Sequence, residues 1–145
     1  LITITGGKWT TYRKMAADAV DNAAFIGKLN KEKCITAETK IGDELEKKNR
    51  IQEILKNDAS LAEKIHTNYS FTKAQVVYAV QFEMAICIED ILARRIRLLF
   101  LDARLAIELA PMVASIMATY LQKDKNWEAA EIKSFTQLAG QYILQ

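Results

Sequence analysis

A short run near the N-terminus, residues 6–11 (Gly-Gly-Lys-Trp-Thr-Thr), combines residue types that can hold a negatively charged group. The adjacent glycines permit a tight turn with positive φ. Thr10 or Thr11 can cap a following helix, whose first turn presents free N–H groups with a partial positive charge. Lys8 adds an ammonium group beside this turn. The run predicts a site that stabilises negative charge or, in the plainer interpretation, only a capped helix after a turn.

A second group of charged residues interrupts an apolar segment between positions 83 and 97. Asp90 and Arg94 are four residues apart and can pair on one helix face. Glu83 can meet Arg95 or Arg97 across a turn or from a neighbouring helix. We interpret this cluster as structural ion pairs, in preference to a phosphate or nucleic-acid site.

The elements that must position the first run are expected to be a strand, a glycine turn and a helix. Leu1–Thr5 is an apolar, β-branched run that predicts a short strand. From Tyr12 to about Gly27, apolar residues recur at helical spacing, and residues 28–43 predict a linking loop. Because a protein seldom starts in mid-strand, and no methionine precedes Leu1, we expect a longer chain whose N-terminal part contains the sheet that this strand joins.

The remaining sequence predicts packed helices, five or six in the whole chain. Apolar spacing indicates a helix over about 44–56 and a shorter one from near Asp58. Thr72-Lys73-Ala74-Gln75 has capping-box spacing and predicts a helix through about Phe82. The apolar segment 84–101 predicts a buried helix whose charged groups need partners.

Two further caps are expected towards the C-terminus. Asp102 can cap a long helix over about 103–122, and Pro111 should bend that helix or begin a second one, because proline lacks the N–H donor. Asn126 is the expected N-cap of a last helix over about 127–143. The predicted fold class is therefore all-α, a helical bundle with one short strand at its N-terminus.

Composition restricts the possible functions. The 145 residues carry 20 basic and 18 acidic side chains, interspersed, for a net charge of +2. This balance disfavours a nucleic-acid binder built on Arg94, Arg95, Arg97 and Arg104. One histidine and the isolated Cys34 and Cys87 offer no zinc-ligand pattern, and we expect two reduced thiols. No run approaches a membrane span, and no signal peptide is recognisable.

Residues 6–14, Gly-Gly-Lys-Trp-Thr-Thr-Tyr-Arg-Lys, resemble the last flavin-contacting turn of the FAD-dependent glycerol-3-phosphate dehydrogenases, whose pattern is close to GGK-x-TTYRK. The resemblance implies that Gly7, Thr10 and Thr11 lie against the isoalloxazine ring, with main-chain N–H groups reaching its carbonyl end. It also implies that Lys8 stands beside flavin and substrate. An ammonium group there would bind the substrate phosphate or offset charge on the flavin.

A second block carries the same resemblance over residues 77–104. Val77–Ala85 is similar to the family pattern YAV-x-x-E-x-A, and Glu89–Leu98 is similar to EDxLxRRxRL. The match continues through Phe100–Arg104. The two blocks lie in the relative positions that the family predicts. The resemblance therefore divides the chain into the last strand, flavin turn and helix of an FAD domain (1–27), a linker (28–43) and a C-terminal helical domain (44–145).

The resemblance implies a parent flavoprotein, related also to alpha-glycerophosphate oxidase, that oxidises sn-glycerol 3-phosphate to dihydroxyacetone phosphate through FAD. Quinone would accept the electrons, or oxygen in an oxidase. The chain lacks the GxGxxG fingerprint, the remaining substrate-binding residues and a general base. Alone, it should neither retain FAD nor turn over.

The expected partners are the missing N-terminal FAD domain and, through self-association of exposed apolar faces, further copies of the chain. The expected location is cytoplasmic, and the resemblance is compatible with a parent protein that is peripheral on the inner face of the cell membrane. The alternative interpretation is a non-enzymatic helical interaction module whose GGKWTT turn is only a cap.

Overall fold

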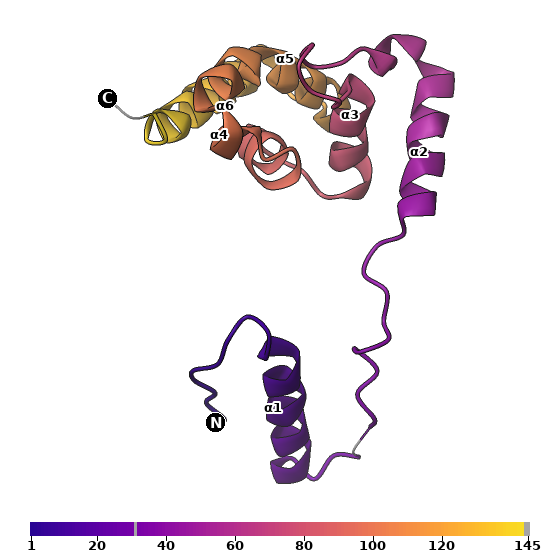
Figure 1. The fold of residues 1–145 in the computed structure, drawn as a ribbon, viewed down its shortest axis with the longest axis vertical. Coiled ribbons are helices and arrows are strands. Elements are labelled where there is room, and N and C mark those ends of the chain that lie inside the picture. The colour runs from indigo at the N-terminus through magenta and orange to yellow at the C-terminus, as the bar shows by residue number, and fades with distance from the viewer. Residues whose placement is uncertain (31, 144–145) are drawn as a thin grey trace. The chain divides into compact units, whose positions relative to one another are not determined.

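The computed structural model describes residues 1–30 and 32–143, and its regular elements are helices (Figure 1). It divides into two compact units, Leu1–Asp43 (unit 1) and Glu44–Gln145 (unit 2). Within the described residues, β-pairing is limited to one isolated bridge between Lys64 and Thr72. The predicted all-α class is therefore confirmed.

The strand expected at Leu1–Thr5 is not formed, so that prediction is wrong for this chain. These residues are irregular and exposed. A strand is stable only when a neighbouring strand satisfies its backbone N–H and C=O groups. The described residues contain no such neighbour, and β-branched composition alone cannot replace it.

Unit 1 contains one helix, α1 (Tyr12–Ile26), where helical spacing predicted it. It ends at Gly27, whose N–H donates to the Ala23 carbonyl at 2.8 Å. None of its residues is buried, and the exposed fractions of Val20 and Phe25 are 67% and 85%. The apolar stripe of α1 therefore has no core to join among the described residues of unit 1.

Unit 2 begins with three elements that the sequence located. These are α2 (Glu44–Asn57), η1 (Ala59–Ala62) and α3 (Lys73–Phe82). The helix predicted near Asp58 is only a 3-10 turn, in which the Asp58 carboxylate accepts from the Ser60 N–H. The capping box of α3 is confirmed, with the Thr72 N–H donating to Gln75 Oε1 at 2.9 Å.

The single helix predicted over 84–101 is broken, which corrects the sequence interpretation. A π-helical segment, η2 (Asp90–Arg95), is followed by the one-turn helix α4 (Leu98–Leu101). Met84 and Arg97 have positive φ angles, 56° and 61°, which end regular helix on either side of η2. Neither position is a glycine, so the sequence carried no conventional sign of these breaks.

The two long C-terminal helices are α5 (Ala103–Leu121) and α6 (Lys125–Gly140). As predicted, the Asp102 carboxylate caps α5 by accepting from the Leu105 N–H at 2.9 Å. The helix continues through Pro111, so no second helix begins there. The predicted cap of α6 is wrong, because Asp124, and not Asn126, accepts the Trp127 N–H.

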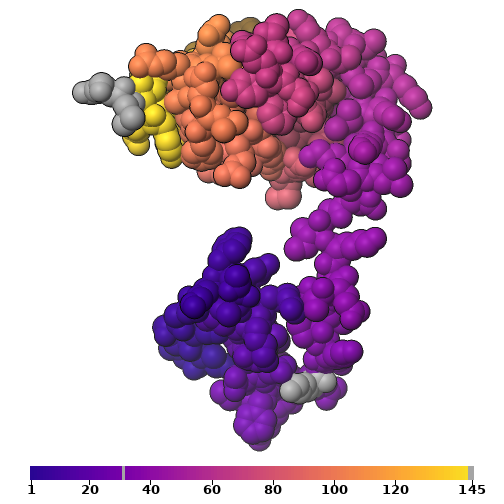
Figure 2. Space-filling view, in the orientation of Figure 1, coloured from indigo at the N-terminus to yellow at the C-terminus, as the bar shows by residue number. Residues whose placement is uncertain are grey.

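The core of unit 2 joins α3, η2, α4, α5 and α6 (Figure 1). Figure 2 shows the outer surface of this unit in the same orientation. The largest fully buried side chains include Ile88, Ile91, Leu92, Leu98, Leu99 and Met117. A smaller cluster joins α2 and η1 to α3 through Ile54, Leu61, Ala74 and Val77. By length and hydropathy, α5 is the one described helix that could cross a membrane. Ala106, Val113 and Met117 of this helix are fully buried in the core of unit 2, as expected of a core helix.

Candidate functional site

The glycine turn of residues 6–11 has the backbone conformation that its sequence predicted. Gly6 and Gly7 have φ angles of 78° and 100°, which L side chains rarely adopt. A Cβ atom added at Gly7 would also collide with the Met15 sulfur. The positive φ therefore favours glycine at position 7, and a side chain there would also require the flexible Met15 side chain of α1 to move.

Thr11 closes the turn and does not cap α1 in the expected way. It occupies the N-cap position, but its hydroxyl accepts from the Lys8 N–H at 2.9 Å and donates to the Lys8 carbonyl at 3.0 Å. Its own N–H also donates to the Lys8 carbonyl. These three bonds fix the backbone of Lys8, while Thr10 remains exposed.

The start of α1 keeps free donors. Among the described residues, no hydrogen bond is made by the backbone N–H groups of Tyr12, Arg13 and Lys14. The Lys8 side chain is exposed and makes no ion pair with the described residues. The turn therefore presents three free N–H groups at the positive end of a helix and an unpaired ammonium group, an arrangement that can hold a negatively charged or carbonyl-bearing ligand.

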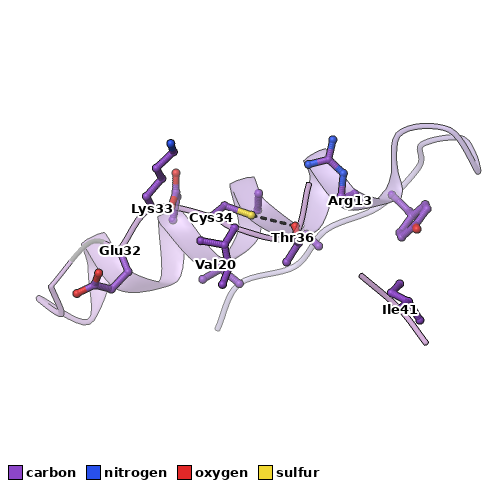
Figure 3. A pocket seen from close by; sticks show the side chains of 12 residues that line it. Arg13, Val20, Glu32, Lys33, Cys34, Thr36 and Ile41 are labelled. Atoms are coloured by element: carbon purple, nitrogen blue, oxygen red, sulfur yellow. Dashed lines mark hydrogen bonds between the residues drawn. The ribbon is translucent and has the colours of Figure 1, made fainter. Parts of the chain in front are cut away.

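Two hollows adjoin this turn. The first, about 380 Å³, is lined by residues that include Gly6, Gly7, Lys8 and Trp9. The second, about 500 Å³, lies between α1 and residues 32–41, and Figure 3 shows Val20 and Ile41 on its apolar lining and the Cys34 thiol hydrogen-bonded to Thr36. Tyr12 and Ala16 line both hollows. Unit 1 can thus supply one wall of a ligand site, but its residues do not enclose one.

The charged cluster of unit 2 is a set of structural ion pairs. Arg95 Nε donates to Glu83 Oε2 at 3.0 Å, and its other nitrogens donate to the backbone carbonyls of Glu83 and Asp90. The second Glu83 oxygen accepts from Lys47 Nζ at 3.0 Å. The predicted Asp90–Arg94 pair is also present, at 2.7 Å.

Asp90 holds the turn that precedes η2. Its Oδ2 accepts from the backbone N–H groups of Ile86 and Cys87, at 2.9 and 3.2 Å. Burial by itself would raise the pKa of Asp90, but the bonds from Ile86, Cys87 and Arg94 outweigh burial and lower that pKa. Burial raises the pKa of the neighbouring Cys87 thiol. Because Glu83, Asp90, Arg94 and Arg95 all have partners, these four residues are better suited to fixing the fold than to binding a phosphate.

A family model that describes the C-terminal domain of alpha-glycerophosphate oxidase matches residues 2–129, and the chain belongs to this family. Its relatives include FAD-dependent glycerol-3-phosphate dehydrogenases. The N-terminal turn and the helices from α1 to α5 lie within the matched region, whereas most of α6 lies beyond it.

Individual relatives agree with this assignment. The chain is 33% identical over 163 residues to a probable mitochondrial glycerol-3-phosphate dehydrogenase of Dictyostelium discoideum. The aligned region covers 92% of this chain and 26% of that protein. For the probable mitochondrial glycerol-3-phosphate dehydrogenase of Caenorhabditis elegans the identity is 28% over 177 residues, and the aligned region covers 99% of this chain and 24% of that protein. For the mitochondrial glycerol-3-phosphate dehydrogenase of Saccharomyces cerevisiae the identity is 26%, and the aligned region covers 97% of this chain and 30% of that protein. The chain thus spans about a quarter of these relatives' length, and no solved structure matches it significantly.

Proposed function

We propose that this chain acts as the C-terminal part of a flavoprotein that oxidises sn-glycerol 3-phosphate to dihydroxyacetone phosphate and passes electrons through FAD to quinone. Family membership and the coverage of about a quarter of each relative support this proposal. The observation that carries it for this chain is the turn at residues 6–11. Its glycine conformation, free helix-start donors and unpaired Lys8 match what one edge of a flavin site requires.

The residues of the turn have distinct proposed roles. Gly7 lets the backbone bend beneath a flat ring, and Thr11 holds that bend through its bonds to Lys8. Thr10 is exposed and would lie beside the ring, and the free N–H groups at the start of α1 would donate to carbonyl oxygens of the ring. Bound FAD would accept the hydride that substrate oxidation releases.

Lys8 is the proposed contact to substrate. Its ammonium group would bind the phosphate of glycerol 3-phosphate or offset negative charge on the reduced ring. A fixed backbone and an exposed side chain suit this role, because Thr11 holds the main chain while Lys8 makes no ion pair with the described residues. No residue of this chain is proposed as the general base.

The helical unit is proposed to cover the flavin domain or to form subunit contacts. It exposes Phe82, Met84 and Ile86 at the turn between α3 and η2, where exposed fractions reach 86%. The bonds that Asp90 and Arg95 make hold this turn in place. A rigid, exposed apolar turn is the kind of feature that packs into another protein surface.

The test is the reading frame upstream of the Leu1 codon. We expect it to encode a strand, a GxGxxG turn and a helix, and we expect the full-length protein to be yellow and to oxidise glycerol 3-phosphate. Lys8→Ala should lower kcat/KM, whereas Lys14→Ala, which removes the ammonium paired with Asp18, serves as the matched control. A natural chain that starts within a few residues of Leu1 would contradict the proposal and leave the helical interaction module as the better interpretation.

A further inference from the structure

The two adjacent threonines of the N-terminal turn, Thr10 and Thr11, are held differently. Thr10 is exposed, and its hydroxyl makes no hydrogen bond with the described residues. The Thr11 hydroxyl, in contrast, accepts from the Lys8 N–H and donates to the Lys8 carbonyl. A hydroxyl has one proton to donate, and that of Thr11 is used within the chain. Thr11 therefore has no proton left for a carbonyl oxygen of a bound ring.

Three hydrogen bonds hold the backbone of Lys8 on both sides. Two are those of the Thr11 hydroxyl, at 2.9 and 3.0 Å, and the third runs from the Thr11 N–H to the Lys8 carbonyl at 2.9 Å. Because the N–H and the C=O of Lys8 are both held, its backbone dihedral angles are restricted. The rotamers open to a side chain depend on those angles. Thr11 thus limits the directions in which the Lys8 ammonium group can point.

Met15, in the first turn of α1, supports this arrangement. Its sulfur lies 3.5 Å from the Thr11 hydroxyl oxygen and occupies the space that a Cβ atom on Gly7 would need. Met15 is half-buried, whereas Thr11 and Lys8 are exposed. The Met15 side chain therefore packs behind the turn and leaves the Thr11 hydroxyl directed at Lys8.

Two other threonine hydroxyls of the chain make a simpler bond. Those of Thr39 and Thr119 each donate to the carbonyl of the residue four positions earlier, in both cases at 3.0 Å. Such a bond satisfies the hydroxyl locally and does not hold both ends of another residue. Thr11 instead bonds twice to one residue, and that residue is the proposed contact to substrate.

We propose that Thr11 is a positioning residue for the oxidation of glycerol 3-phosphate, which acts through Lys8 and makes no hydrogen bond to the flavin. This inference rests on the proposed function. It divides the roles within the turn: Thr10 and the free N–H groups at the start of α1 contact the ring, whereas Thr11 sets the direction of the Lys8 ammonium group. Loss of the Thr11 hydroxyl then lowers the rate although no contact to ligand is lost, because catalysis depends on the placement of contact groups.

The experiment compares variants of the full-length protein in steady-state oxidation of glycerol 3-phosphate and in FAD content after gel filtration. Thr11→Val removes the hydroxyl and should lower kcat/KM by roughly tenfold to a hundredfold, the range expected for a misplaced contact group, with FAD content unchanged. Thr11→Ser keeps the hydroxyl and should restore most of kcat/KM. Thr39→Val, the matched control, removes a hydroxyl-to-backbone bond elsewhere in unit 1 and should change neither readout.

A double-mutant cycle tests whether Thr11 acts through Lys8. Because Lys8→Ala removes the group that Thr11 positions, Thr11→Val should add no further loss of kcat/KM in that background. Additive losses, or loss of FAD from Thr11→Val alone, would overturn the inference, since the hydroxyl would then act on the flavin or on another group. A fully active Thr11→Val protein would overturn this inference alone. An unaltered full-length protein without FAD would overturn the proposed function as well.

Discussion

The two units of this chain differ in whether their apolar residues are buried. Every buried hydrophobic residue of the described chain lies in unit 2, whereas α1 in unit 1 buries none. Yet α1 has the same apolar spacing that places one face of α5 in a core. Helical periodicity therefore predicts which face of a helix is suited to burial, but it does not guarantee that a surface is present for that face to pack against.

The difference has an energetic consequence. A helix as short as the 15 residues of α1 is marginally stable in water unless tertiary packing supports it. Burial of α5 against α3 and α6 provides such support within unit 2. The comparison thus predicts that unit 2 is held by its own core and that α1, which buries no residue, is much less stable.

The largest expected effect is a difference in stability between alanine substitutions at Leu92 in unit 2 and Leu29 in unit 1. Leu92→Ala should destabilise the chain by about 2–5 kcal/mol, because Leu92 is 0% exposed and the substitution leaves a cavity. The matched substitution Leu29→Ala, at a residue 70% exposed in unit 1, should change stability by less than about 0.5 kcal/mol. Urea unfolding followed by circular dichroism measures both. Similar losses would mean that unit 1 has a core of its own.

A smaller effect separates two arginines of the ion-pair cluster. Arg95→Ala should lower stability by about 1–3 kcal/mol, because Glu83 and two backbone carbonyls lose a half-buried donor. Arg94→Ala should have a smaller effect, since Arg94 is 54% exposed and water can replace it. Thermal melts of the two variants, measured side by side, test this order. A larger loss of stability for Arg94→Ala would contradict the stabilising role assigned to the hydrogen bonds of Arg95.

The pH dependence of unit 2 should report on Asp90. A folded pKa below the ordinary value of 3.8 stabilises the fold above that pH, and this contribution is lost as the pH falls through the folded value. The melting temperature of the unaltered chain should therefore exceed that of Asp90→Asn near neutrality, and the difference should shrink below about pH 4. A difference that grew on acidification would show that Asp90 is not held ionised by its neighbours.

The smallest expected effect in this chain belongs to Gly7. Gly7→Ala strains the turn, because φ is 100° and Met15 must move, but no buried residue depends on it. We expect an unchanged melting temperature for the 145-residue chain. In a full-length flavoprotein, the same substitution should lower FAD retention, measured by flavin absorbance after gel filtration. A large loss of stability in the short chain would instead make the turn part of a core.

Local signals predicted much of unit 2. The capping box at Thr72 and the Asp102 cap were predicted because each depends on residues a few positions apart. Charges in an apolar segment need partners, which predicted that Glu83 would meet Arg95 or Arg97, and the structure pairs it with Arg95. The break after the π-helical segment was missed, because the left-handed residue there is Arg97 and no glycine marks it.

The candidate site was only partly predictable. The turn geometry at Gly6 and Gly7 follows from glycine itself, but the use of the Thr11 hydroxyl to close the turn was not anticipated. The expected strand at Leu1–Thr5 failed because strand formation depends on a neighbour that sequence composition cannot supply. Asp124 displaced Asn126 as the cap of α6, since both are competent cap residues two positions apart.

The most direct test of the comparison is amide hydrogen exchange on the 145-residue chain, resolved by segment. The account predicts strong protection of α3 and α5 together with near-complete exchange of α1. Protection of α1 comparable with that of α5 would contradict it, because α1 would then have packing that the chain itself provides.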